Sequence, residues 1–479
     1  MTLLDHPGTF WKPSLPVVEE LTPAPEAEEV FLRLASEPYC IYFDSARRDT
    51  PLGRYSFVAA DPVEMLVCGP EEADPLGRLA KALEGFETRT VDGLPPFQGG
   101  AAGLLSYDLG RSLERLPSAR YDEFQTPVMA MGLYDLVVVF DHHEHRTWII
   151  SQGFPEKELS VRRRLAEKRL ERLLHLMLLP AELPVRRPTG PANLTIQEFA
   201  AQHPIARWPG VTSTFTERLY MDAVARAIEY IRGGDIFQVN LAQRLLAPAA
   251  DDAVDLYLRL RQRNPATFAG YFDLGPFQIA SASPERFLKV HSRNVEARPI
   301  KGTRQRSARP EADLFAAEEL RESEKDLAEN VMIVDLLRND IARVCRPDSV
   351  KVTQLCQLES YEFVQHLVSA VCGQLEEGRS AIDLLRAAFP GGSVTGAPKI
   401  RAMEIIAELE PTARGPYCGA LGYLGFDGSL DTNILIRTIT AGRGWWQAPV
   451  GGGIVAQSVP AREYEETWHK AEGLLRAFS

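Results

Sequence analysis

The sequence predicts an α/β or α+β protein with extensive β-sheet, and three observations lead to that prediction. Up to about residue 150 the chain reads as strands and turns, with β-branched and aromatic runs at 39–45 and 133–141. From about Thr216 onwards, strand-like runs alternate with long helical patterns. Hydrophobic residues make up 45% of the chain and charged residues 25%, as in an ordinary globular protein with a large core.

Two features of the first half have competing interpretations. His142, His143 and His145 fall between two strand-like runs, where a solvated hairpin turn is expected. A metal cluster is the weaker interpretation, because no Cys, Asp or Glu array at ligand spacing accompanies them. Residues 160–180 have a basic amphipathic pattern, which predicts a helix. Packing on the core with a solvated basic face is favoured over a membrane-surface or partner-binding role.

The elements beyond residue 215 follow one another closely. A helix is predicted from the capping residue Thr216 to the stop at Gly233 and Gly234. Further strands are predicted at 236–246, 268–274, 277–283, 352–358, 418–426 and 432–441. Further helices are predicted at 312–344, 380–389, 398–409 and 462–478, and the run 361–371 also reads as helix-like. We therefore divide the chain into an amino-terminal half (1–180), a Pro-rich linker region (181–214) and a carboxy-terminal region (215–479).

Charge and cysteine usage narrow the class of protein. A net charge of −12 argues against non-specific nucleic-acid binding. The six cysteines include no C-x-x-C pair, which fits reduced thiols in a cytosol. The chain begins without a signal-peptide pattern, and no apolar run approaches the ~18–20 residues that cross a bilayer. We expect a cytoplasmic protein that binds neither nucleic acid nor membrane.

Several carboxylates stand in places that are awkward for a purely structural role. Glu285 follows a predicted strand behind a Ser-Pro turn, and Glu329 lies on a predicted helix among apolar residues. Glu463, Glu466 and Lys470 are spaced by three and four residues, so they share one helix face, as a surface ion-pair ladder also would. Glu329 and Glu466, without a Cys or His array, favour a hard cation such as Mg²⁺.

Cationic and glycine-rich segments complete the pattern. The loop 389–398 enters a predicted helix and lacks the ending of a nucleotide phosphate loop, so its backbone N–H groups suit a carboxylate. The glycines at 451–453 allow close approach of a ligand, and Arg437, predicted to lie inside a strand, needs an anionic partner. His366 is by default a satisfied core histidine. Lys301, followed by a Gly-Thr pair suited to a tight loop, is either a solvated charge or a placed amine. The substrate implied is a small anion with more than one carboxylate.

The ordered motifs PIKGT, SPERF, AENVMIVDLLRNDIARV, HLVS, GGSVTGAPKIRAMEII, CGALGYL, IRT and GGGIVA resemble those of the chorismate-utilising enzymes. That family includes anthranilate, aminodeoxychorismate, isochorismate and salicylate synthases. The resemblance is dense over residues 215–479, and upstream segments such as RYSFVAADP are similar to the aminodeoxychorismate-forming branch. It implies large antiparallel-rich sheets packed face to face with helices outside, and a chorismate-binding catalytic region at 215–479.

Two positions favour one branch of that family. By resemblance, Lys301 attacks ring carbon 2 of chorismate while the 4-hydroxyl leaves, and ammonia then enters at carbon 4. The anthranilate branch typically has alanine there. Gln238 stands where the isochorismate and salicylate branches have a lysine that activates water, and an amide cannot act as a base. The resemblance thus implies 4-amino-4-deoxychorismate as product, a step towards p-aminobenzoate and folate. The alternatives are an anthranilate synthase component or a non-catalytic chorismate- or tryptophan-binding regulatory subunit.

The same resemblance assigns roles to individual residues. Lys301 and Glu285 are the expected catalytic residues, and Glu329 and Glu466 are the expected Mg²⁺ ligands. The expected substrate-binding residues are His366, Ser393, Gly396, Tyr417, Arg437, Gly453 and Lys470. Ser45 matches a contact of the tryptophan pocket of relatives, although its FDS context departs from the Leu-Glu-Ser run of feedback-regulated members. No cysteine lies in a G-x-C-x-G elbow, so a separate glutamine amidotransferase subunit is expected to supply ammonia.

Overall fold

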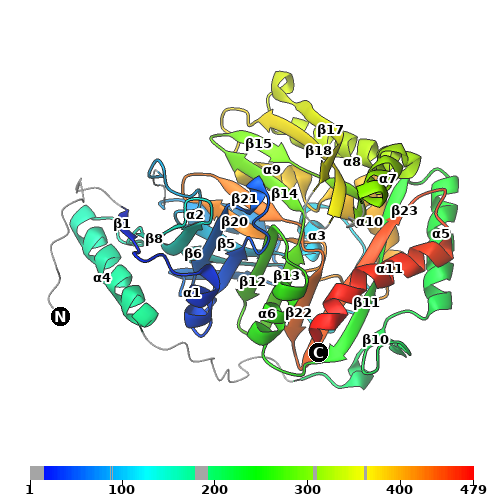
Figure 1. The fold of residues 1–479 in the computed structure, drawn as a ribbon, viewed down its shortest axis with the longest axis horizontal. Coiled ribbons are helices and arrows are strands. Elements are labelled where there is room, and N and C mark those ends of the chain that lie inside the picture. Colours follow the sequence, from blue (N-terminus) through cyan, green and yellow to red (C-terminus); the bar gives the residue numbers. More distant parts are fainter. Residues whose placement is uncertain are drawn as a thin grey trace.

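The structure is a computed structural model that describes residues 16–178 except 87 and 89, and residues 193–305, 310–360 and 364–478. Two large antiparallel sheets form its centre (Figure 1). The first sheet has the order β1 (Val17–Glu20), β8 (Arg146–Ser151), β7 (Leu136–Asp141), β3 (Tyr55–Ala59), β2 (Ile41–Asp44), β12 (Phe268–Asp273), β13 (Phe277–Ser283), β22 (Thr438–Gly442), β23 (Trp445–Ile454), β11 (Gln238–Pro248), β10 (Thr212–Ser213) and β9 (His203–Pro204), with β19 (Gly396–Ala397) also paired to β11.

The second sheet lies against the first. Its order is β16 (Ile300–Gln305), β18 (Val364–Gln374), β15 (Asn294–Ala297), β14 (Arg286–His291), β21 (Leu430–Asn433), β20 (Ala420–Gly425), β5 (Gly100–Leu105), β6 (Met129–Tyr134) and β4 (Glu64–Cys68), with β17 (Lys351–Ser360) also paired to β18. Both halves of the chain contribute a block of strands to each sheet, and the blocks meet at one junction per sheet: β2 pairs with β12, and β5 pairs with β20. The boundaries expected at 180 and 215 stay predictions, since residues 179–192 lie outside the described part.

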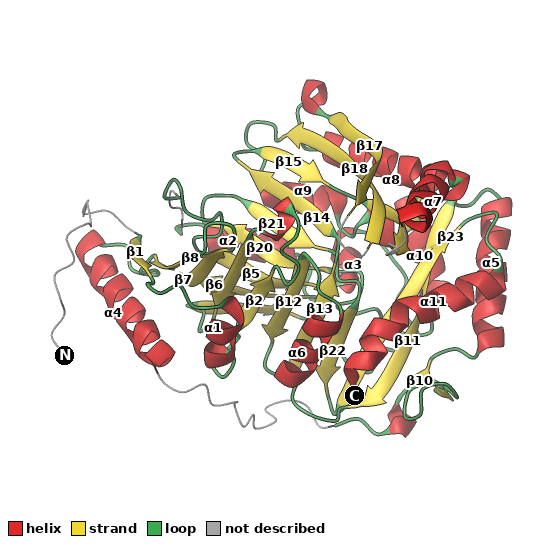
Figure 2. Ribbon diagram, viewed as in Figure 1, coloured by secondary structure: helices red, strands yellow, loops and turns green. Residues whose placement is uncertain are grey.

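Helices cover the outer faces of both sheets (Figure 2). They are α1 (Ala27–Leu34), α2 (Pro75–Leu83), α3 (Gly110–Leu113), α4 (Leu159–Leu178), α5 (Glu217–Arg232), α6 (Ala253–Arg263), α7 (Pro310–Glu322), α8 (Glu324–Ala342), α9 (Ala381–Ala388), α10 (Lys399–Leu409) and α11 (Pro460–Leu475). One core lies between the sheets, where Ile41 and Val137 of the first meet Leu104 and Leu421 of the second. The predicted fold class is confirmed: mixed α/β with large antiparallel sheets and outer helices.

Local signals account for several elements. Thr216 caps α5 by accepting a hydrogen bond from the Leu219 backbone N–H at 3.2 Å, and Gly233 follows its end, as predicted. The described part of the amphipathic segment 160–180 lies in α4 and buries Ala166 and Leu170, also as predicted, while residues 179 and 180 lie outside the described residues. No helix in the described ranges is both long and apolar enough to span a membrane.

Three predicted elements are wrong in type or continuity. The helix-like run 361–371 is mostly strand β18, because it pairs with β15, β16 and β17 and tertiary pairing overrides local propensity. The helix predicted at 312–344 is broken into α7 and α8 at Ser323, whose side chain caps α8 by accepting from the Asp326 N–H at 3.3 Å. The strand predicted at 432–441 passes from one sheet to the other, as β21 and then β22.

Candidate active site

Two crossings between the sheets lie side by side and create the candidate site. Residues 284–285 lead from β13 in the first sheet to β14 in the second, and residues 434–437 lead from β21 back to β22. The Ile434 N–H donates to the Glu285 carbonyl, and the Ala282 N–H donates to the Arg437 carbonyl, both at 3.0 Å. Arg437 therefore lies outside a regular strand, contrary to prediction, and has a φ of 52°. This junction brings Glu285 and Arg437 to the same place.

The Glu285 carboxyl group is buried at this junction. Its side chain accepts a hydrogen bond from the Ser393 hydroxyl at 2.9 Å, and the residue is 5% exposed. Burial raises the pKa of Glu285 to about 7, against the opposing effects of Lys301, Ser393 and the backbone N–H of Ile300. A carboxyl group with such a pKa is partly protonated at neutral pH and is able to donate a proton.

Lys301 lies in strand β16 and is half-buried, not in a tight loop as predicted. Its Nζ donates to the Ser393 carbonyl oxygen at 3.3 Å. The pairing of β16 with β18 shifts register between Lys301 and Thr303, so the intervening Gly302 forms a bulge with a φ of 67°. A Cβ at Gly302 would lie 2.6 Å from a methyl carbon of Leu320, so glycine is required beside the lysine.

Ser393 links the two expected catalytic residues. It belongs to the single turn η5 (Gly392–Val394), formed by the glycine-rich loop that precedes α10. Its hydroxyl bonds Glu285 and its carbonyl bonds Lys301. The same loop continues into β19, where Gly396 has a φ of 145° and its absent Cβ would lie 2.1 Å from the Gln238 carbonyl oxygen. The loop thus packs directly against β11.

Three arginines, Arg298, Arg304 and Arg306, lie near Lys301 in the sequence. Arg298 forms an ion pair with Glu359 at 2.5 Å. The side chains of Arg304 and Arg306 lie outside the described residues.

Strand β23 borders the candidate site with three consecutive glycines, which expose only backbone. Gly451 to Gly453 pair with β11 between Asn240 and Ala242. A Cβ at Gly453 would lie 2.5 Å from the Gln238 Nε2 and 3.5 Å from the Glu329 Oε2. Gln238 is fully buried, and neither polar atom of its side chain has a partner in the described part of the protein. Such a buried amide marks a place where a polar ligand would be bound.

The expected metal ligands approach β23 from two helices. Glu329 projects from α8 to Gly453, and Glu466 projects from α11 to within 3.5 Å of the Cβ position of Gly452. Two carboxylates provide the hard oxygen donors that Mg²⁺ prefers, with water and substrate oxygens completing its coordination. In this structure, Glu466 pairs with Lys470 at 2.7 Å, and Lys470 Nζ also donates to the Gly451 carbonyl at 2.9 Å. Within the described ranges, no three His, Cys, Asp or Glu side chains are grouped to hold a metal ion.

Three further expected binding residues, Tyr417, Arg437 and His366, are related by electrostatic interactions. Tyr417 and Arg437 are near enough to interact electrostatically, and burial lowers the pKa of Arg437. His366 on β18 is 8% exposed, and burial together with the charges of Arg47 and Arg437 lowers its pKa to about 4, so it is neutral at physiological pH. Arg437 thus connects Tyr417 and His366.

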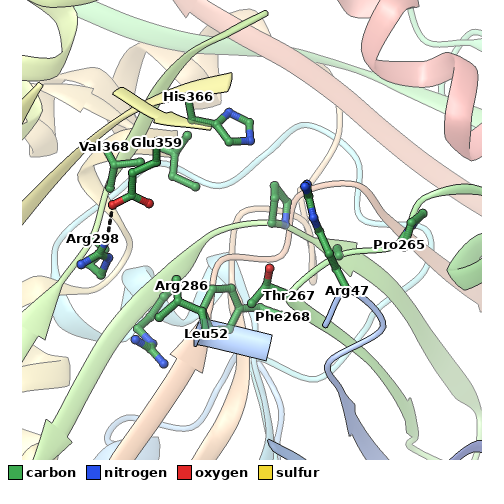
Figure 3. Close-up of a pocket in the computed structure, with 13 residues that line it drawn as sticks. Arg47, Leu52, Pro265, Thr267, Phe268, Arg286, Arg298, Glu359, His366 and Val368 are labelled. Carbon is green, nitrogen blue, oxygen red and sulfur yellow. Dashed lines mark hydrogen bonds and ion pairs between the residues drawn. The ribbon is translucent and has the colours of Figure 1, made fainter. Parts of the chain in front are cut away.

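His366 also lines a cavity that sequence reasoning did not anticipate. Arg47 of the amino-terminal half and His366 reach into it from different walls (Figure 3). Arg286 and Arg298 are further lining residues, both engaged in ion pairs. No pattern near Arg47 marks it in the sequence, because its place beside His366 in this cavity depends on the pairing of the two halves of the chain within the same sheets.

Ser45, the expected tryptophan contact, lines a second cavity. Aromatic side chains of Phe43, Tyr55 and Tyr423 share that lining. The Ser45 hydroxyl donates to the Tyr55 carbonyl oxygen at 2.6 Å. Leu52, Thr267, Phe268 and Arg286 line both this cavity and the one at His366.

A second set of residues missed by sequence reasoning is the buried pair Glu410 and Arg414 behind η5. The available signal was two opposite charges four residues apart, between an amphipathic helix and the apolar run at 416–426.

The chain belongs to the chorismate binding enzyme family, whose model matches residues 38–476. It is 40% identical over 464 residues to aminodeoxychorismate synthase component 1 of Escherichia coli, covering 94% of this chain and 95% of the relative. It is 44% identical over 407 residues to anthranilate synthase component 1 of Thermus thermophilus, covering 85% and 83%.

Solved structures show the same fold. Anthranilate synthase component I from Streptococcus pneumoniae has a TM-score of 0.74 and 32% identity, with coverage of 88% of this chain and 92% of that chain. The isochorismate synthase MenF from Escherichia coli has a TM-score of 0.71 at 18% identity, which shows the fold alone. The relatives are divided between different reactions of one substrate class, so the product has to be argued from the site.

Proposed function

We propose that this chain converts chorismate and ammonia to 4-amino-4-deoxychorismate, a step towards p-aminobenzoate and folate. The observation that carries the proposal is the joint attachment of Lys301 and Glu285 to Ser393. A primary amine and a carboxyl group that protonates near neutrality are thereby held against one residue. An anthranilate synthase that adds ammonia directly at carbon 2 has no use for this amine.

In the proposed reaction, the unprotonated Lys301 amine forms a bond to ring carbon 2. The ring double bonds shift, the carbon 4–oxygen bond breaks, and Glu285 gives its proton to the departing hydroxyl, which leaves as water. Ammonia then bonds to carbon 4, the double bonds shift back, and the Lys301 nitrogen leaves carbon 2. Arg437 and Tyr417 would hold the enolpyruvyl carboxylate, with the Gly453 backbone beside it.

We also propose that Glu329 and Glu466 hold Mg²⁺. When bound, the ion supplies electrostatic neutralisation of the ring carboxylate. His366, Gly396 and Lys470 would line the substrate, and a separate amidotransferase subunit would release ammonia from glutamine. Charge and cysteine usage favour a cytoplasmic setting. The cavity at Ser45 is the candidate tryptophan site.

The direct test is product identity. The purified chain is incubated with chorismate, Mg²⁺ and ammonium, and the amine is identified by mass and retention. We expect 4-amino-4-deoxychorismate, formed with a kcat lower by ~10²–10⁴-fold in Glu285→Gln. Anthranilate as the product would favour the second candidate, which the 44% identity to the Thermus thermophilus relative supports. No turnover at all would favour a regulatory subunit.

A further inference from the structure

Glu410 and Arg414 form an ion pair buried behind the candidate site. The Arg414 Nη2 lies 2.6 Å from Glu410 Oε1, and its Nε donates to Oε2 at 2.9 Å. The two side chains are only 3% and 6% exposed. Removing two charges from water is costly, so a buried pair by itself is weak evidence for a contribution to stability. Its other contacts indicate a different role.

The pair ties two backbone segments together. Arg414 Nη1 donates to the Val394 carbonyl oxygen at 2.9 Å, and Nη2 donates to the Asn240 carbonyl oxygen at 2.7 Å. Glu410 Oε1 accepts from the Ala242 backbone N–H at 2.8 Å. The guanidinium therefore joins η5 to β11 through hydrogen bonds that only a planar, multidentate donor makes together.

Both segments carry residues of the candidate site. Val394 directly follows Ser393, which bonds Glu285 and Lys301. Asn240 pairs with Gly453. The Arg414 Cζ also lies 5.8 Å from the centre of the Tyr417 ring. One buried side chain thus contacts three segments from which site residues project.

We propose that Arg414 and Glu410 are a positioning pair that holds η5 so that Ser393 engages both Glu285 and Lys301. Neither residue touches substrate; they act through Ser393. The inference rests on the proposed function, since it assigns the pair to the amination reaction.

The experiment compares Arg414→Lys with a matched control, Arg244→Lys. Arg244 forms a bidentate pair with Glu123 at 2.8 and 2.9 Å, with side chains 5% and 6% exposed. Each variant keeps the positive charge but loses the planar guanidinium group that donates several hydrogen bonds at once. Unfolding midpoints, kcat and the pH profile of kcat with ammonium are measured for both, for Ser393→Ala, and for the double variant Ser393→Ala with Arg414→Lys.

We expect Arg414→Lys to lower kcat at least tenfold and to move the alkaline limb of the profile to higher pH. The Ser393 hydrogen bond lowers the pKa of Glu285, so loosening it lets that pKa rise. Among the residues that the structure describes, Lys301 and the buried thiol of Cys418 also interact electrostatically with Glu285, and both are unchanged in all variants. Ser393→Ala should move the limb in the same direction. The double variant should lose less kcat than the two single losses combined, because both single changes act on the Ser393–Glu285 hydrogen bond, while the carbonyl that accepts from Lys301 remains in Ser393→Ala. Arg244→Lys should leave the limb in place.

The proposal is overturned if Arg414→Lys loses stability and activity together without moving the limb, or if its effect adds fully to that of Ser393→Ala. If Arg414→Lys does not fold, Glu410→Gln takes its place, since glutamine keeps the acceptor for Ala242. Failure of both to fold, while Arg244→Lys folds, would assign the pair to the fold alone and also overturn the proposal. Wild-type product identity separately decides the proposed function.

Discussion

At the scale of single residues, Ser393 is the centre of the candidate chemistry. Its hydroxyl donates to a carboxyl group and its carbonyl accepts from an amine, so it sets the positions of Glu285 and Lys301 together. Ser393 therefore acts by positioning these two residues, and neither its hydroxyl nor its carbonyl group has to react. Two predictions concern the residues that Ser393 bonds, Lys301 and Glu285.

Lys301→Ala removes the proposed nucleophile. We expect 4-amino-4-deoxychorismate formation to be lost, because the variant lacks the amine proposed to bond to ring carbon 2. Glu285 can still assist loss of the hydroxyl, so direct addition at carbon 2 should shift the product towards anthranilate or an isochorismate-like compound. The half-buried lysine packs little, so stability should change by about 1 kcal/mol or less.

The measurement for Lys301→Ala is product identity, together with the intact mass of wild type after exposure to chorismate without ammonia. An adduct on wild type that is absent from the variant supports the covalent step. The same product at the same rate in the variant would show that Lys301 is a solvated charge.

Glu285→Gln should change both activity and the pH dependence of stability. As a general acid, Glu285 must be protonated, so kcat of wild type should fall as pH rises through about 7. The variant should lose ~10²–10⁴-fold in kcat. The folded-state pKa lies above the ordinary value of 4.5, so this group stabilises the fold below pH 4.5, and that stabilisation is lost as pH rises through about 7.

The stability part of this prediction is measured by urea unfolding at pH 4 and pH 8. Between these values, wild type should lose on the order of 3 kcal/mol more of its free energy of unfolding than Glu285→Gln does. An identical pH dependence in the two proteins would contradict the burial argument for this carboxyl group.

At the scale of elements, β23 has no side chains at three consecutive positions beside the candidate site, because those positions are glycines. Gly453→Ala would place a Cβ 2.5 Å from the Gln238 Nε2. We expect KM for chorismate to rise at least tenfold, since the methyl group fills space beside the substrate. Gly69→Ala is the control, because a Cβ there meets nothing within 4 Å. Equal KM values in the two variants would show that β23 does not border the substrate.

Helices α8 and α11 contribute one expected metal ligand each. We expect a chelator to abolish turnover and added Mg²⁺ to restore it, since the donors are carboxylate oxygens. Glu466→Gln should raise the Mg²⁺ concentration needed for half-maximal activity at least tenfold. Glu472→Gln, on the same helix but paired with Arg476, should leave it unchanged. Full activity in excess chelator would refute the metal site.

At the scale of the whole molecule, the two halves of the chain form one body. Strand β2 lies beside β12, and β5 lies beside β20, so neither sheet is complete without both halves. The cavities at His366 and Ser45 share lining residues as a result. Arg286, the residue next to Glu285, thus lines both cavities.

The source of nitrogen is a prediction about the molecule as a whole. The sequence contains no cysteine in a G-x-C-x-G elbow, so the isolated chain should use ammonium and not glutamine. Addition of an amidotransferase subunit from a relative should make glutamine usable at neutral pH. Rates with 15N-amide glutamine, and label in the product, measure this directly. Labelled product from the isolated chain would reveal a glutaminase site.

The sequence by itself determined the family, because residues that contact a common substrate recur in type and order. It also predicted α5, whose cap and glycine stop are local signals. Only the tertiary structure decided that the described part of the run 361–371, residues 364–371, is a strand, since its partners β15, β16 and β17 are separate in sequence. The pKa of Glu285 likewise depends on burial by segments that are distant along the chain, and the role proposed for Arg414 depends on carbonyls at positions 240 and 394. Burial and hydrogen-bond geometry arise from long-range packing, which local residue patterns do not contain.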